Sequence, residues 1–265
     1  MMSDWVLLRG LTREARHWGA FDAALAAHGL VGAGERVVCI DLPGNGVEHS
    51  RAAPQSVITM MEFVRERCAA LKVRLPCRVL AMSLGAMVAT AWAERHAGEV
   101  ERLVLINTSM RPFARLTERL RPAAWPMLLR IAMTWTQPER CEATILDLTC
   151  NRHDTRDADI VRWSALRRTH GASAANALRQ LAAAARFRAA RDAPRCPALL
   201  LSSAADRLVD PICSARIAKQ WRASHKVHPW AGHDLPHDDA DWTCEAIAAW
   251  LGEYERTYDI RAASA

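Results

Sequence analysis

The strongest fold signal lies in the segment Arg78-Val79-Leu80-Ala81-Met82-Ser83-Leu84-Gly85-Ala86-Met87. Its apolar start predicts a buried strand over residues 78–82, and helical spacing begins directly after Ser83 and continues over 84–96. Small residues stand two positions before and two positions after Ser83, where a sharp strand-to-helix turn crowds the backbone. Such a turn lifts the serine hydroxyl above the sheet and directs the next N–H, that of Leu84, toward an oxyanion. The alternative is a serine that only caps an ordinary helix.

The rest of the chain repeats this alternation of strand and helix. Further strands are predicted over residues 5–8, 37–40, 103–106, 198–201 and 226–229, and further helices over 14–28, 57–71, 211–221 and 239–254. Strands that alternate with helices predict right-handed crossovers and a mostly parallel sheet. The strands are short and apolar throughout, which indicates that helices cover both faces. The fold class is therefore α/β.

Residues 110–192 interrupt the alternation with helical spacing and few strand signals. We expect a core formed by 1–109 and 193–265, with 110–192 inserted as a helical cap. The net charge of the chain is +6, and residues 111–195 alone carry sixteen Arg and eight acidic residues. All of the positive excess therefore lies in the middle of the chain.

Composition excludes several classes of protein. With 265 residues and 51% hydrophobic residues, the chain is not disordered as a whole. No apolar run approaches the ~20 residues of a membrane span. The N-terminal sequence lacks the features of a signal peptide, and the eight cysteines form no CxxC pair. We therefore expect a cytoplasmic protein with reduced thiols.

A serine is a weak nucleophile unless a base removes its proton, so an acid and a base should follow at other strand ends. Asp206 ends a loop after the strand predicted over 198–201, and His233 lies in a glycine-containing loop after the strand predicted over 226–229. The order Ser83, Asp206, His233 is the serine–acid–histidine order of one known architecture.

Other residues compete for the roles of acid and base. Asp210 and Asp234 are alternative acids, although Asp210 precedes Pro211 at a predicted helix start, where capping the helix is the simpler role. The alternative bases are His225, His228 and His237.

These segments together resemble the α/β-hydrolase superfamily over nearly the whole chain, and in particular its small carboxylesterases, such as the pimeloyl carrier-protein methyl esterases. The motifs that carry the resemblance are residues 7–11 (oxyanion turn), 41–46 (D-x-P-G-x-G turn), 81–85 (nucleophile elbow), 203–211 (acid loop) and 232–233 (histidine loop). The resemblance implies an α/β-hydrolase fold with a helical cap.

The resemblance also implies roles for single residues. Ser83 would be the nucleophile, His233 the base and Asp206 the residue that orients the base. The backbone N–H groups of Leu11 and Leu84 would stabilise the oxyanion.

The chain departs from the family pattern at two positions. Most relatives have Gly in place of Ala81 and His in place of Arg9. We expect Arg9 either to pair with Glu14 or to reach toward an anionic group of the substrate.

The cap would shape the substrate site. Its apolar residues would line an acyl pocket, or would simply pack the cap against the core; those that we assign to substrate binding are Met110, Phe113, Trp125, Trp135 and Trp163. Its arginines would steer an anionic ester, a coenzyme A thioester or an acidic acyl carrier protein, or would simply form solvated helix faces.

The predicted function is a serine hydrolase that cleaves carboxylic esters or thioesters through an acyl-enzyme intermediate. Acyltransferase, lyase or perhydrolase chemistry at the same site, and a non-catalytic binding protein, are the alternatives. The sequence contains no phosphate-binding loop and no pattern typical of a metal site, so we expect no cofactor and no metal. No nucleic-acid-binding module is recognised.

Overall fold

The computed structural model describes residues 2–263, with side chains described up to residue 254. Within these residues, six parallel strands form one sheet in the order β2-β1-β3-β4-β5-β6. The strands are β1 (Trp5–Leu8), β2 (Val37–Ile40), β3 (Cys77–Met82), β4 (Val100–Ile106), β5 (Ala198–Ser203) and β6 (Ser224–His228). The predicted α/β class and parallel sheet are confirmed.

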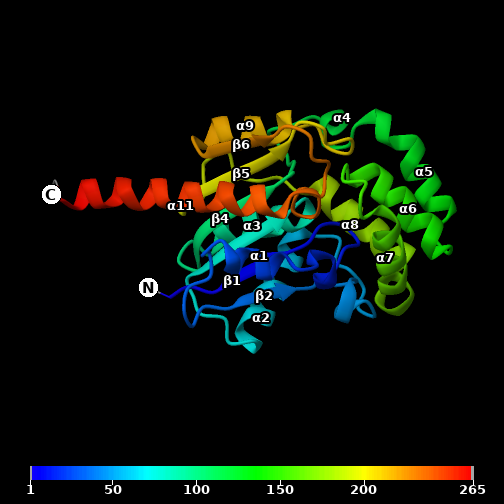
Figure 1. Cartoon of the computed structure of the whole chain (residues 1–265), viewed down its shortest axis with the longest axis horizontal. Helices are drawn as coiled ribbons and strands as arrows, with labels where there is room; N and C mark the ends of the chain where they lie inside the picture. Colours follow the sequence, from blue (N-terminus) through cyan, green and yellow to red (C-terminus); the bar gives the residue numbers. More distant parts are fainter. Residues whose placement is uncertain (1, 264–265) are drawn as a thin grey trace.

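Helices cover both faces of this sheet (Figure 1). On one face, an apolar cluster packs α1 (Phe21–Ala27) and α11 (Ala240–Ala263) against the sheet. On the other face, a second cluster packs α2 (Val57–Ala70), α3 (Leu84–Arg95) and α9 (Ile212–Trp221) against it. These two clusters explain why the central strands β1, β3, β4 and β5 are largely apolar on both faces.

Several predicted elements differ in their bounds; β4, for example, begins at Val100 rather than at residue 103. Two of these differences have a clear cause in the structure. The helix expected over 14–28 is divided, because η1 (Ala15–Trp18) ends at Gly19, which has a φ of 59°. The last strand begins at Ser224 rather than at residue 226, because its pairing with β5 starts there.

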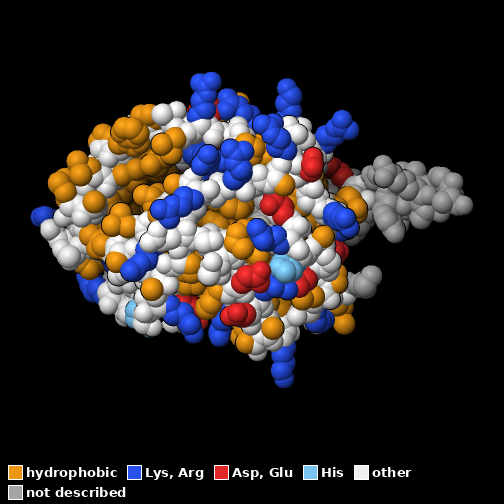
Figure 2. All heavy atoms as spheres, turned by 180° about the vertical axis from the view of Figure 1, so that it is seen from behind, with side chains coloured by type: hydrophobic (Ala, Val, Ile, Leu, Met, Phe, Trp, Pro, Cys, Tyr) orange, Lys and Arg blue, Asp and Glu red, His pale blue; other side chains and the backbone are white. Residues whose placement is uncertain are grey.

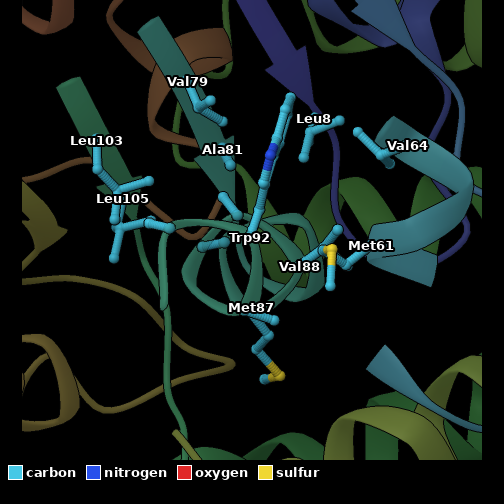
Figure 3. Packing of buried hydrophobic residues seen from close by; sticks show 14 of the residues in the cluster. Leu8, Met61, Val64, Val79, Ala81, Met87, Val88, Trp92, Leu103 and Leu105 are labelled. Carbon is cyan, nitrogen blue, oxygen red and sulfur yellow. The ribbon is translucent and has the colours of Figure 1, made fainter. Parts of the chain in front are cut away.

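Trp92 shows how α3 is fixed on the sheet. Figure 3 shows its ring extending from α3 between Ala81 of β3 and Leu8 of β1. Its indole N–H donates to Glu99 at 2.7 Å, so the one polar atom of a fully buried side chain is satisfied. The methyl group of Ala81 is buried in this cluster, which accommodates the departure from glycine.

Between β4 and β5 the chain leaves the sheet and forms helices on one side of the molecule (Figure 1). These are α4 (Leu116–Arg119), η3 (Pro122–Ala124), α5 (Trp125–Met133), α6 (Pro138–Thr149), α7 (Arg156–His170) and α8 (Ala174–Arg186); the short remaining elements of the core are η2 (Gly46–Glu48) and α10 (Leu235–Asp238). We call residues 110–192 the cap segment; its standing as a separate unit stays a prediction.

All eight cysteines are free thiols. Within the described part of the chain, none of the helices is long and apolar enough to cross a membrane.

Candidate active site

Ser83 occupies a sharp turn between β3 and α3. Its φ of 53° and ψ of −118° lie outside the regions that L-residues favour, so the surrounding structure must hold this conformation. Its N–H donates to the carbonyl of Ile106 at 3.0 Å, which continues the sheet pairing up to the turn. A Cβ atom on Gly85 would lie 2.5 Å from the carbonyl oxygen of Arg9. Only glycine therefore lets the start of α3 approach β1 so closely.

Two backbone N–H groups border the space beside Ser83. Leu11 and Leu84 line the same cavity, and neither N–H has a hydrogen-bond partner among the described residues. The loop that carries Leu11 is held in place from the cap segment, because Gln180 of α8 accepts the N–H of Thr12 at 2.9 Å. The role of these two N–H groups as oxyanion donors stays a prediction.

Asp206 and His233 meet at the carboxyl ends of β5 and β6. Their side chains are buried, and His233 Nδ1 lies 2.7 Å from Asp206 Oδ2. The other carboxylate oxygen accepts the N–H groups of Leu208 at 2.8 Å and Val209 at 2.9 Å. Asp206 is thereby fixed in orientation, and a proton on Nδ1 leaves Nε2 of His233 free to act as a base.

The electrostatic surroundings of His233 favour its protonated form. Burial lowers the pKa of this histidine, but the charge of Asp206, the hydrogen bond to Asp206 and the charge of Asp234 outweigh that effect. The net result is a pKa above the usual value.

Ser83 and His233 line one cavity of about 120 Å³. Among the described residues, the serine hydroxyl forms no hydrogen bond with the imidazole. Such bonds are commonly long in free enzymes and tighten when substrate binds. The structure thus brings the three residues to one place, with the acid–base contact formed and the base–serine contact open.

Asn107 is a residue of the site that the sequence analysis missed. It is buried at the end of β4 with a φ of 44°, and its amide nitrogen donates to the carbonyl oxygens of Gly232 at 3.2 Å and His233 at 2.8 Å. Its amide oxygen accepts the N–H of Ser203. Asn107 therefore joins the acid loop to the histidine loop. The sequence feature that could have pointed to Asn107 is a polar residue directly after a buried strand.

Arg9 does not pair with Glu14, whose carboxylate binds Arg16 instead. Arg9 forms a two-point ion pair with Asp234, in which Nη1 lies 3.0 Å from Oδ1 and Nη2 bonds Oδ2. Its guanidinium also lies 4.8 Å from the ring centre of Trp18. Burial raises the pKa of Asp234, but Arg9 outweighs it, so the net shift is downward. Arg9 lines the smaller cavity, yet its charge is already neutralised.

The competing acids and bases have other partners. Of the two alternative acids, Asp234 binds Arg9. The side chain of Asp210 accepts the N–H of Ile212 at the start of α9, as expected for a helix cap. Among the histidines, His225 bonds Ser202, His228 lies 3.2 Å from Asp239 and His237 lies 3.0 Å from Asp159.

A second cavity of about 390 Å³ begins at Ser83 and extends beneath the cap segment. Its lining is almost wholly apolar, and the helices that contribute to it include α3, α5 and α8. In Figure 2, hydrophobic side chains gather around a hollow at the end of the molecule where the cap segment lies. Trp135 lines both cavities and is stacked under the guanidinium of Arg167 at 4.5 Å.

Four residues that we assigned to substrate binding line neither cavity. Met110 is buried in the core, and Phe113 packs edge-on against Trp221. Trp125 is 53% exposed on the outside of α5. Trp163 is buried between α7 and the core, with its ring 4.6 Å from the guanidinium of Arg13. These four fasten the cap segment or face solvent, which corrects the expectation.

No group of three or more potential metal ligands (His, Cys, Asp, Glu) is clustered in the part of the chain that the structure describes.

The fold and the arrangement of these loops are those of an α/β-hydrolase. Residues 7–240 match the family model described as "Serine aminopeptidase, S33", and the chain belongs to this family of hydrolases. No match to a curated protein was found.

Solved structures share the fold. A protein described as a non-heme bromoperoxidase from Mycobacterium tuberculosis has a TM-score of 0.73 at 20% identity, covering 96% of this chain and 93% of its own. An enol-lactonase from Burkholderia xenovorans has a TM-score of 0.71 at 21% identity, covering 95% and 92%. A thermophilic esterase from Thermogutta terrifontis has a TM-score of 0.66 at 20% identity, covering 95% and 90%.

Proposed function

We propose that this hydrolase cleaves carboxylic esters or thioesters through an acyl-enzyme on Ser83. The observation that supports the proposal most is the 2.7 Å contact between Asp206 and His233 beside a serine held at a positive φ. An apolar cavity extends from the same serine, as a hydrophobic acyl chain requires.

In the proposed mechanism, Ser83 Oγ attacks the acyl carbon while His233 Nε2 takes its proton. The negative charge that develops on the carbonyl oxygen is stabilised by the N–H groups of Leu11 and Leu84. The protonated imidazole then gives its proton to the departing alcohol or thiol, and Asp206 stabilises it meanwhile. Water attacks the acyl-enzyme with the same base, which releases the acid and restores the serine.

Ester substrates are favoured over peptides with a free amino terminus, although the family carries an aminopeptidase name. An α-ammonium group needs an available carboxylate. Asp234 is the one carboxylate among the described residues that line the two cavities, and Arg9 already occupies it at both oxygens. The enol-lactonase and esterase names of similar structures agree with ester chemistry.

Hydrolysis of p-nitrophenyl alkanoates of two to ten carbons tests the proposal. We expect turnover by the wild type and a loss of at least ~10³-fold in Ser83→Ala, since removing the nucleophile leaves only binding and oxyanion contributions. Ser109 lines the larger cavity as well, so Ser109→Ala is the matched control and should retain activity. Equal rates in wild type and Ser83→Ala would refute the assignment.

An acidic acyl carrier as the bearer of a thioester is a second candidate. Exposed arginines of the cap segment that have no ion pair among the described residues include Arg111, Arg130 and Arg140. Reversing their charge should raise KM for a carrier-bound thioester in a salt-sensitive way, while Arg95→Glu, on the far end of α3, should not. An unchanged KM at low salt would exclude this carrier, and acyl transfer to an added alcohol would indicate transferase chemistry.

A further inference from the structure

Arg119 is the one charged side chain among the described residues that line the larger cavity. It is the last residue of α4 and is only 8% exposed. Its neighbours in the lining are leucines, alanines and other apolar residues, apart from Ser83 and Ser109. A cation in such surroundings is costly unless something compensates its charge.

The partners of Arg119 within the protein compensate it only in part. Nη2 donates to the carbonyl of Ala184 at 2.6 Å and Nη1 to that of Ala185 at 3.3 Å, both in the last turn of α8. A guanidinium has five N–H donors, and Nε is buried without a partner. No carboxylate of the described residues lies within ion-pair distance.

A role as helix cap accounts for the two carbonyl contacts but not for the remaining charge. The end of a helix offers only about half a negative charge, which leaves a buried guanidinium with a positive excess. Burial lowers the pKa of Arg119; Cys213 opposes this shift without reversing it, and the charge of Arg111 adds to it. An arginine nevertheless stays protonated in proteins, so the excess charge persists.

The two cavities would hold different parts of the substrate, the leaving group and the acyl chain. His233 lines the smaller cavity, and the base must reach the leaving group there. The larger cavity contains Leu84 and Arg119 but not His233, so it would take the acyl chain. An anionic group that meets Arg119 would therefore lie on the acyl chain, at the end far from the bond that is cleaved.

We infer that the acyl chain ends in a carboxylate that pairs with Arg119, so that the substrates are monoesters or monothioesters of dicarboxylic acids. This inference rests on the proposed function of Ser83. The distal carboxylate takes no part in bond breaking. It binds in the ionised form, and the product is the free dicarboxylic acid.

The first test compares p-nitrophenyl monoesters of dicarboxylic acids with analogues of equal length that end in a primary amide. Chains of six to ten carbons are used, because shorter monoesters cleave themselves by attack of the neighbouring carboxylate. We expect wild type to prefer the carboxylate, and Arg119→Gln to lower that preference in kcat/KM by ~10–100-fold, as for a lost charge-assisted hydrogen bond.

Two further variants separate a role in binding from a role in folding. Arg119→Lys keeps the charge but loses the planar fork, so it should retain part of the preference. Arg115→Gln, one turn earlier and exposed, should retain all of it. A wild type without preference for the carboxylate, or an Arg119→Gln variant with an undiminished preference, would overturn the inference.

A binding measurement tests Arg119 without turnover. In Ser83→Ala, calorimetry should show that the monoamide of the dicarboxylic acid, which keeps one carboxylate, binds at least ~10-fold more tightly than the diamide, and that Arg119→Gln removes the difference. If neither ester is hydrolysed but this difference is found, the proposed function fails while the carboxylate site stands. Equal binding of the monoamide and the diamide refutes the site whatever the rates.

Discussion

Arg9 and Asp234 form a buried ion pair that joins the oxyanion turn to the loop of His233. Arg9 directly precedes Gly10 in the sequence, and Asp234 directly follows His233. A positive charge on Arg9 and a negative charge on Asp234 therefore both act on His233. Arg9 lowers the pKa of His233 and Asp234 raises it, so each partner has a separate effect on the base.

The pH dependence of activity should reveal this arrangement. The base must be neutral to act, and its pKa is raised, so kcat/KM of the wild type should increase with pH through a midpoint above the usual ~6.5 of histidine. In Asp234→Asn the midpoint should move to lower pH, because an anion is lost and Arg9 is left uncompensated. In Arg9→Met it should move upward.

The control for the pH profiles is Asp210→Asn, whose carboxylate caps α9 away from the imidazole. Its midpoint should equal that of the wild type. Shifts of the same sign in Asp234→Asn and Arg9→Met would contradict the electrostatic account and would indicate a general loosening of the loop.

Asn107 should matter for catalysis without touching substrate. Asn107→Ala removes the donor to the carbonyls of Gly232 and His233 and should lower kcat by ~10–100-fold, with a destabilisation of ~1–3 kcal/mol for the unsatisfied buried groups. KM should change less than kcat. Steady-state kinetics and thermal unfolding of the same preparation measure both effects. A loss of stability with an unchanged kcat would mean that Asn107 is only structural.

A comparison of Trp135 with Trp125 tests which tryptophan of the cap segment lines the cavity. Trp135 lines both cavities, whereas Trp125 is 53% exposed and lines neither. Trp135→Ala should lower kcat/KM for long acyl chains by ~10–100-fold and affect acetate much less, because buried apolar contact scales with chain length. Trp125→Ala should leave the chain-length profile unchanged. Similar profiles for both variants would contradict the description of the cavity.

Gly85 is required for the turn at Ser83. The Cβ of Gly85→Ala would lie 2.5 Å from the carbonyl of Arg9 and 2.7 Å from that of Leu8, so backbone must move. We expect a destabilisation of ~1–3 kcal/mol and a marked loss of kcat. At Gly98 a Cβ meets nothing within 4 Å, so Gly98→Ala is the control for glycine replacement as such. Urea denaturation compares the two.

The fold was accessible from the sequence because its signals are local. Short apolar strands between helical patterns predict a parallel sheet, and β1 and β2 have the predicted bounds. The division of the helix expected over 14–28 was not predicted, since it depends on a positive φ at Gly19.

The site was predictable only where a motif marks it. Ser83, Asp206 and His233 each follow a strand, so topology alone brings them together. The partner of Arg9 is 225 residues away in the sequence, and no local pattern reveals such a contact. The same limit explains Trp163 and Met110. Apolar side chains on a cap helix look alike whether they face the cavity or the core, and only packing decides between the two.

The most direct measurement is labelling with a fluorophosphonate probe, with the modified residue located by mass spectrometry of proteolytic peptides. The account predicts one adduct per chain, on Ser83, with no adduct in Ser83→Ala and an unchanged adduct in Ser109→Ala. Labelling should slow strongly in His233→Ala, because the hydroxyl then lacks its base. A folded wild type that stays unlabelled, or an adduct on another serine, would contradict the account.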